Sequence, residues 1–185
     1  MSLELLVPIE NETLVGLSLL PKQIIGKNIS IHSEASGLPE LKGLQIVLIG
    51  LSEYRNSFYA NTTYNVNQFR KVFYELYPGN WNLKIADLGD LPNGEKVEDT
   101  YFAVKEIGIH LKQMNIIPVF IGGSHDLLFP LYQVFQKFIE DELYHSQQTV
   151  ISVTGHSHSG TSVNEAEALV KTLKQRPTVF VKAGD

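Results

Sequence analysis

The segment Ile117-Pro118-Val119-Phe120-Ile121-Gly122-Gly123-Ser124-His125-Asp126 decides the fold of this chain. It opens with an apolar, β-branched run that predicts a strand. Pro118 favours the start of that strand over its centre. The glycine pair then breaks the strand before a helix that we expect from near Asp126 to about Tyr144. The segment therefore predicts a strand, a glycine turn and a helix in succession.

The same alternation of strand and helix is predicted on both sides of this segment. Further strands are expected at Gln45–Gly50, Leu83–Leu88, Thr149–Thr154 and Thr178–Lys182, and Gly89–Gly94 is expected to be a turn. Apolar residues at three- and four-residue spacing predict amphipathic helices with these inward faces: Val66, Phe69, Phe73 and Leu76; Tyr101, Val104, Gly108, Leu111 and Met114; Leu127, Leu131, Val134 and Phe138; Val163, Ala166, Val170 and Leu173. This pattern predicts an α/β fold with a doubly wound parallel sheet, whose ligands lie at the C-terminal ends of the strands.

Composition limits the class of protein. A chain of 185 residues can bury one substantial core, so we expect a single domain over residues 1–185 with an N-terminal arm at 1–40. The net charge of −5 comes without a basic stripe, which argues against a nucleic-acid partner. The absence of cysteine excludes disulfides and thiolate metal sites, and no apolar run is long enough for a membrane span. We expect a cytoplasmic protein.

Histidines occur in the two loops that follow the third and fourth predicted strands. His125 follows the glycine pair, and His156 and His158 lie in a loop rich in serine and glycine. If the two strands are neighbours, the three imidazoles could converge on a divalent metal. The competing interpretation is that loop histidines are solvated, which suits the spacing equally well. The remaining histidines are interpreted as structural or solvated: His32, His110 and His145.

Charged residues also lie near the predicted strand ends. Asp87 and Asp90 close the second strand, where capping of a turn is favoured over a role in a site. Glu53 and Arg55 follow the first strand and are placed for substrate contact, but a solvated pair at the rim is favoured. The sequence contains no glycine-rich phosphate loop and no serine nucleophile elbow.

Four segments together resemble the ureohydrolase family of arginase, agmatinase and formimidoylglutamase, with the formimidoylglutamase-like branch nearest. The resemblance covers roughly residues 45–138. Its segments are Ile46–Gly50, Gln68–Arg70, Lys84–Asp90 and Ile117–Asp126. The resemblance implies a three-layer, arginase-like α/β fold, here apparently truncated, and commonly a homo-oligomer. It also implies metal-dependent hydrolysis of a guanidino or formimino C–N bond in a linear amidine.

In the family, the histidine of Gly-Gly-x-His binds one of two manganese ions, so the resemblance makes His125 a candidate ligand. The family's Asp-x-His-x-Asp element falls on Thr154–His158, where His156 alone matches and His158 replaces an aspartate. The later Asp-x-Asp element has no counterpart before Asp185. Without these carboxylates a manganese pair would be held poorly. We expect impaired or absent catalysis, through a fragment, a diverged member or a natural short form.

Two other hypotheses remain open. The chain could be a non-catalytic α/β domain that keeps the scaffold for binding or oligomerisation. Alternatively, His125, His156 and His158 could bind a single zinc ion, since zinc accepts three histidines and a water.

Overall fold

The computed structural model of the chain describes residues 2–57, 65–80, 82–142, 151–154 and 179–182. Its internal contacts divide it into two units, Met1–Lys137 and Phe138–Asp185, and each is described by itself. The prediction of one domain over residues 1–185 stays a prediction. No helix in the described ranges is long and apolar enough to cross a membrane.

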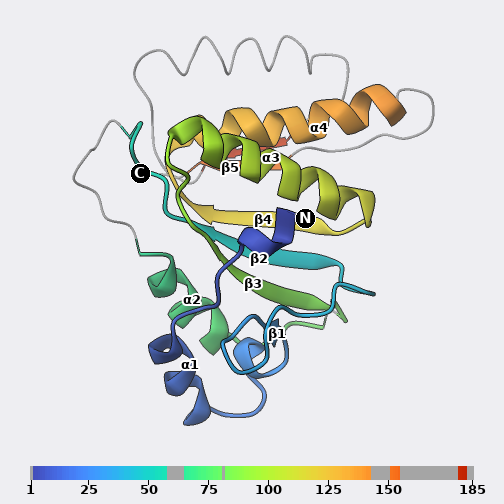
Figure 1. The fold of residues 1–185 in the computed structure, drawn as a ribbon. Coiled ribbons are helices and arrows are strands. Elements are labelled where there is room, and N and C mark those ends of the chain that lie inside the picture. The colour runs from blue at the N-terminus through green and yellow to red at the C-terminus, as the bar shows by residue number, and fades with distance from the viewer. Residues whose placement is uncertain (1, 58–64, 81, 143–150, 155–178, 183–185) are drawn as a thin grey trace. The chain divides into compact units, whose positions relative to one another are not determined.

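The first unit contains a parallel four-stranded sheet with the strand order β1-β3-β2-β4. Figure 1 shows helix α3 over one face of this sheet and helices α1 and α2 toward the other. The strands are β1 (Ser30–Ile31), β2 (Ile46–Leu51), β3 (Ile85–Leu91) and β4 (Ile117–Gly122). The helices are α1 (Asn11–Ser18), α2 (Val66–Glu75), α3 (Val97–Gln113) and α4 (Leu128–Glu142), with 3₁₀ turns at Ser2–Leu5, Ile25–Lys27 and His125–Leu127. The predicted α/β architecture with flanking helices is confirmed.

Two apolar cores lie in this unit. The larger one joins the sheet to α3 through Val47, Ile49, Leu51, Ala86, Leu88, Val104, Ile107 and Leu111. The smaller one gathers Ile9, Leu17, Ile24 and Tyr74 beside α1 and α2. Residues 1–40 contribute to both cores and also supply β1, which pairs with β3. The arm is therefore joined to the sheet through β1.

The predicted inward face of α2 is confirmed at Val66, which is buried, and at Phe73, which packs against the smaller core, but it is wrong at Leu76, which is 50% exposed. The periodicity assigned Val66, Phe69, Phe73 and Leu76 to the core, but the buried residues are Val66, Asn67, Arg70 and Tyr74. The physical reason lies on β3, where Asp87 offers a buried carboxylate to Arg70 and Tyr74. A buried carboxylate requires such partners, so it determines which face of α2 turns inward.

Strand β3 is longer than predicted, and the expected turn at Gly89–Gly94 starts later. Gly89 has φ +86°, and the pairing of β2 with β3 shifts register between Leu48 and Gly50. A Cβ at Gly89 would lie 2.0 Å from the carbonyl oxygen of Val7. Only glycine fits this conformation and approach, and it lets the strand continue through an irregularity to Leu91.

The other predicted elements of the first unit are confirmed within a few residues. Helix α3 buries Val104, Gly108 and Leu111, although Met114 is 43% exposed. Helix α4 buries Val134 behind a 3₁₀ turn that contains the buried Leu127.

The second unit contains a parallel pair of strands, β5 (Ile151–Thr154) and β6 (Val179–Lys182). Both strands were predicted. The helix expected between them, with Val163 to Leu173, lies outside the described residues.

Candidate functional site

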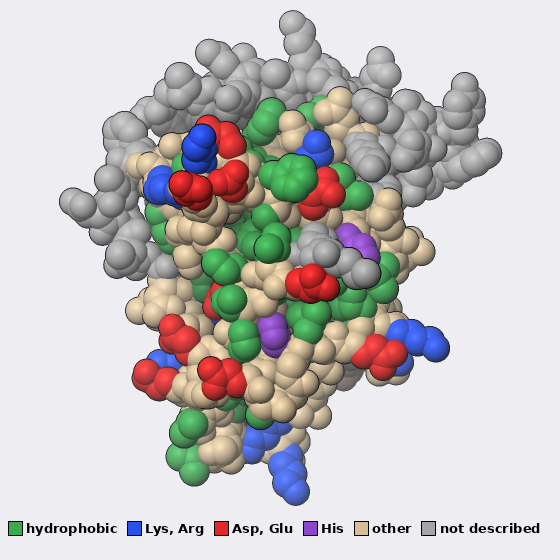
Figure 2. Space-filling model, in the orientation of Figure 1, with side chains coloured by type: hydrophobic (Ala, Val, Ile, Leu, Met, Phe, Trp, Pro, Cys, Tyr) green, Lys and Arg blue, Asp and Glu red, His purple; other side chains and the backbone are tan. Residues whose placement is uncertain are grey.

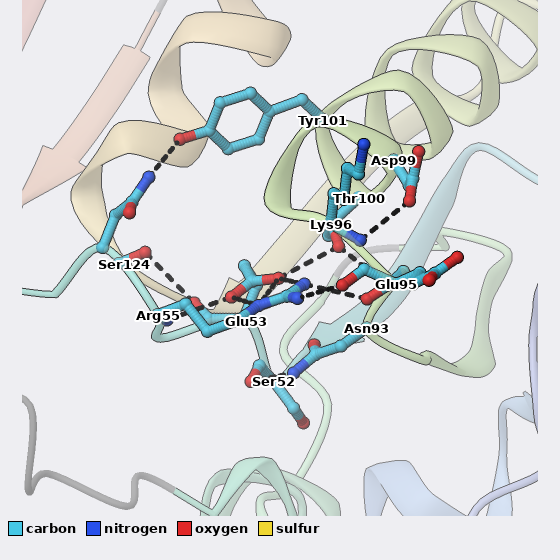
Figure 3. A network of polar contacts seen from close by, with 12 residues as sticks. Ser52, Glu53, Arg55, Asn93, Glu95, Lys96, Asp99, Thr100, Tyr101 and Ser124 are labelled. Atoms are coloured by element: carbon cyan, nitrogen blue, oxygen red, sulfur yellow. Dashed lines mark hydrogen bonds and ion pairs between the residues drawn. The ribbon is translucent and has the colours of Figure 1, made fainter.

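The candidate site is the edge of the sheet at which β2, β3 and β4 end. Because parallel strands present their C-terminal ends on the same side, the loops that follow them meet there. Figure 3 shows polar contacts that link the first turn of α3 to side chains of the three loops, namely Ser52, Glu53, Arg55, Asn93, Glu95, Lys96 and Ser124. This edge carries the segment that first suggested a site.

The loop after β4 turns back sharply through its two glycines. Gly122 and Gly123 have φ +93° and +76°, and a Cβ at Gly122 would lie 2.5 Å from the carbonyl oxygen of Leu51. The turn lets the backbone N–H of Ser124 donate to the carbonyl oxygen of Glu53 at 2.8 Å, with the Ser124 hydroxyl donating at 3.1 Å. The predicted glycine turn is confirmed, and it ties the His125 loop to the loop after β2.

Glu53 is at the centre of the edge, and its predicted place at a solvated rim is wrong. Its side chain is 0% exposed. The carboxylate accepts hydrogen bonds from the backbone N–H and Nε of Arg55, at 3.0 and 2.9 Å, and from the Thr100 hydroxyl at 3.0 Å. The Nη2 of Arg55 makes a further ion pair with it. Burial of a carboxylate requires such partners, and Thr100 is too far away in the sequence to be found by local pattern.

This pairing sets the protonation of both groups. The side-chain hydrogen bond from Arg55 holds the pKa of the Glu53 carboxyl below its ordinary value, against the opposing effect of burial. In turn, the hydrogen bond to Glu53 raises the pKa of Arg55. The edge therefore carries a carboxylate that stays ionised.

Asp126 forms a second polar cluster at the same edge. It accepts hydrogen bonds from the Tyr101 hydroxyl and from the Asn56 amide, the latter at 3.2 Å. Burial, followed by the bond to Asp126, raises the pKa of Tyr101 to about 12. Among the described side chains, Oδ1 of Asp126 is a buried polar atom without a hydrogen-bond partner. Sequence reasoning treated Asp126 as a helix start and did not single out Asn56 as a polar contact of the edge.

Asp87 and Asp90 lie around Arg70 of α2. The guanidinium of Arg70 bonds Asp87 through Nε at 3.0 Å and Asp90 through Nη1 at 2.8 Å. Burial alone would lower the pKa of Arg70, but the bond to Asp87 and the charges of both aspartates raise it. Burial also raises the pKa of Asp90. The predicted capping of a turn by Asp87 is wrong, because the N–H of Gly89 that donates to it at 3.0 Å lies within β3.

A polar cavity of about 500 Å³ opens near this cluster. Its walls combine two carboxylates with the amides of the first turn of α2. The lining residues are Glu10, Ser52, Asn65, Val66, Asn67, Gln68 and Asp90. On the face shown in Figure 2, basic side chains of the described residues stand beside acidic ones and do not gather into one patch.

The residues at the edge do not fit a manganese pair. His125 is exposed at the end of β4, and no three His, Asp or Glu side chains in the described ranges are arranged to hold a metal ion. The nearby carboxylates, Glu53 and Asp126, accept hydrogen bonds from protein groups. His156 and His158 lie outside the described residues, so their convergence with His125 stays a prediction.

No protein-family model matches the chain, and no curated protein sequence matches it. Solved structures that it is similar to include a formiminoglutamase of Trypanosoma cruzi with Mn²⁺, at 17% identity and a TM-score of 0.49, covering 71% of this chain and 45% of the other. A hypothetical agmatinase from Burkholderia thailandensis gives 17% identity and a TM-score of 0.49. The match covers 86% of this chain and 52% of the other. A triple mutant of a T. brucei arginase-like protein, bound with Mn²⁺, gives 12% identity and a TM-score of 0.38. The match covers 93% of this chain and 64% of the other.

Each of these solved structures is matched over only part of its own length. The chain spans about half the length of the first two of these proteins, 45% and 52%. At such identities and TM-scores the likeness assigns no chemistry to this chain.

Proposed function

We propose that this chain is a ureohydrolase-type domain for a linear amidine, in which metal-dependent hydrolysis of the guanidino or formimino C–N bond is impaired or absent. The ureohydrolase-like motifs support the substrate class, since they put His125 at the C-terminal edge of a parallel sheet. The engagement of the edge carboxylates supports the loss of activity. Manganese prefers oxygen ligands, and Glu53 and Oδ2 of Asp126 already accept hydrogen bonds from other side chains, which leaves Oδ1 of Asp126 as the oxygen of these two carboxylates that has no partner among the described residues.

Metal analysis tests this proposal first. The purified chain is dialysed against manganese or zinc and compared with His125→Ala, with His110→Ala on α3 as a matched histidine control. We expect well under one metal ion per chain in all three proteins and release of urea or formamide near background. Near-stoichiometric metal that is lost only in His125→Ala, together with hydrolysis, would show that the enzyme is active. Zinc at one ion per chain would favour the three-histidine site.

The second candidate function is a non-catalytic α/β domain that keeps the scaffold for binding or oligomerisation. A specific observation favours it: hydrogen bonds within the chain hold the loops of the edge together. The Ser124 hydroxyl donates to the carbonyl oxygen of Glu53, and the Asn93 amide donates to that of Ser52, each at 3.1 Å. Such an edge keeps its shape without a ligand. Calorimetric titration with agmatine and arginine separates the two candidates, because only the amidine domain is expected to bind them.

We further propose a cytoplasmic homo-oligomer. Sedimentation of the purified chain at several concentrations tests the assembly, and a monomer at every concentration would contradict it. Fractionation of cells that express the chain tests the compartment.

A further inference from the structure

Among the described residues, the partners of the Arg55 guanidinium are all hydrogen-bond acceptors, and the site that they form, namely Glu53 and the carbonyl oxygens of Gly94 and Glu95, is called the seat. Its Nε donates to both oxygens of the Glu53 carboxylate, at 2.9 and 3.1 Å, and its Nη2 makes an ion pair with the same group. Its Nη1 donates to the carbonyl oxygen of Glu95 at 2.8 Å, and Nη2 donates to that of Gly94 at 2.9 Å. Figure 3 shows these groups converging on the guanidinium from the loops after β2 and β3.

Contacts that do not involve Arg55 hold this seat in place. The Thr100 hydroxyl donates to Glu53 at 3.0 Å and accepts the backbone N–H of Gly94 at 3.0 Å. The loop that carries the carbonyl groups of Gly94 and Glu95 is joined to the β2 loop by a hydrogen bond from the Asn93 amide to the carbonyl oxygen of Ser52. At its other end, the Lys96 backbone N–H donates to Asp99 at 2.8 Å. The seat is therefore organised by α3 and by the β2 and β3 loops.

The chemistry of the seat selects its occupant. A carboxylate that is 0% exposed requires a positive charge, and two carbonyl oxygens beside it require further N–H donors in fixed directions. A planar guanidinium or amidinium supplies both the charge and the donors. An ammonium lacks the paired, coplanar N–H donors, and a neutral amide lacks the charge. Glu53 and these carbonyls thus complement a planar nitrogen cation.

We propose that Glu53, together with the carbonyl oxygens of Gly94 and Glu95, is a binding site for small guanidinium and amidinium cations, which Arg55 fills from within the chain. Arg55 is tethered two residues from Glu53, and its side chain is 39% exposed, so the seat opens to solvent on the side from which a free cation would enter. The tether gives Arg55 a high local concentration, which keeps free cations out of the intact protein. The site involves neither His125 nor a metal, so it holds or fails independently of hydrolysis.

The test empties the seat and offers it a free cation. Arg55→Ala is titrated with methylguanidinium chloride up to about 20 mM, and its melting temperature is followed. A dissociation constant of about 1 mM is within reach of so small a ligand. The melting temperature of Arg55→Ala should then rise by about 5 °C. The intact chain should show no rise, because Arg55 competes.

The controls separate the seat from general effects of salt. Tetramethylammonium chloride at equal concentration should give no rise, since it carries charge without N–H donors. The double variant Glu53→Gln/Arg55→Ala should not respond to methylguanidinium. An absent rise in Arg55→Ala, or an equal rise in the double variant, overturns the proposal. If Arg55→Ala does not fold alone, refolding from urea with methylguanidinium should restore soluble protein, and failure to do so also overturns it.

Discussion

Among the described residues, two clusters bring an arginine together with carboxylates, and they differ in how far the arginine is exposed to solvent. Around Arg70 both the guanidinium and Asp87 are buried, with side chains 1% and 0% exposed. Around Arg55 the carboxylate of Glu53 is 0% exposed, but the arginine is 39% exposed. We call the cluster around Arg70 closed, because its arginine is buried, and the cluster around Arg55 open, because its arginine reaches solvent.

The difference assigns different roles to the two arginines. Arg70 joins α2 to β3, where it bonds Asp87, Asp90, the carbonyl oxygen of Gly89 and the amide oxygen of Asn67. No free ligand could take its place without unfolding the helix from the sheet. Arg55 belongs to the same loop as its carboxylate, and its loss would leave α2, α3 and the sheet in contact. The closed cluster is structural, whereas the open one is exchangeable.

The largest expected effect comes from opening the closed cluster. Arg70→Met keeps much of the side-chain volume but leaves the Asp87 carboxylate buried without its counter-charge. Removing one member of a buried pair costs about 3–5 kcal/mol, so we expect a loss of unfolding free energy of that size in urea denaturation. Changing Asp87 to asparagine in the same chain should recover part of the loss, because the uncompensated charge disappears.

Lys71 is the matched control on the same helix. Its ammonium lies 3.8 Å from Glu12, with side chains 55% and 85% exposed. Exposed pairs contribute little, so Lys71→Ala should change the unfolding free energy by no more than about 0.5 kcal/mol. If Arg70→Met lowers the unfolding free energy by less than about 1 kcal/mol, Arg70 contributes no more than a surface residue does, and the contrast between the clusters fails.

A smaller effect is expected from one hydroxyl of the closed cluster. Tyr74 is fully buried, and its OH donates to Asp87 at 2.8 Å. Tyr74→Phe keeps the ring and removes a hydrogen bond to a charged group, which should cost about 1.5–3 kcal/mol in the same urea measurement. Tyr77 is 65% exposed, so Tyr77→Phe should be close to neutral. Equal losses in the two variants would indicate a general effect of removing a hydroxyl.

The sequence predicted the parts of the fold that local pattern controls. The apolar run before Gly122 became β4, the glycine pair became a turn with positive φ, and the strand–helix alternation became a parallel sheet. These features depend on residues that are close together in the chain. Periodicity and glycine chemistry are therefore sufficient to find them.

Long-range polar contacts explain what the sequence did not predict. The inward face of α2 depends on Asp87, which is 17 positions from Arg70, and the burial of Glu53 depends on Thr100, which is 47 positions away. No local period records such partners, so Phe69 and Phe73 were assigned inward, although they stack on each other with ring centroids 5.5 Å apart and are only partly buried. The sequence placed Glu53 and His125 in loops after strands, where the structure has them, but it assigned the buried carboxylate of Glu53 to solvent.

The smallest expected effect is a difference in the pH dependence of the two clusters. The pKa of Glu53 lies below its ordinary 4.5, mainly through the hydrogen bond from Arg55. Its stabilising contribution is therefore present above 4.5 and is lost as the pH falls through the pKa of the folded state. The pKa of Asp90 lies above its ordinary 3.8, mainly through burial, so its contribution is present below 3.8 and is lost as the pH rises through the folded-state value.

Two variants separate these contributions in urea titrations between about pH 3 and pH 7, the range in which carboxyl groups ionise. The stability of the intact chain relative to Glu53→Gln should increase as the pH rises, because the intact chain gains the ionised pair with Arg55. Relative to Asp90→Asn it should decrease over the same range, because the partly buried carboxylate of Asp90 must ionise. Slopes of the same sign would show that the two carboxylates respond alike to pH, and would contradict the opposite pKa shifts on which this prediction rests.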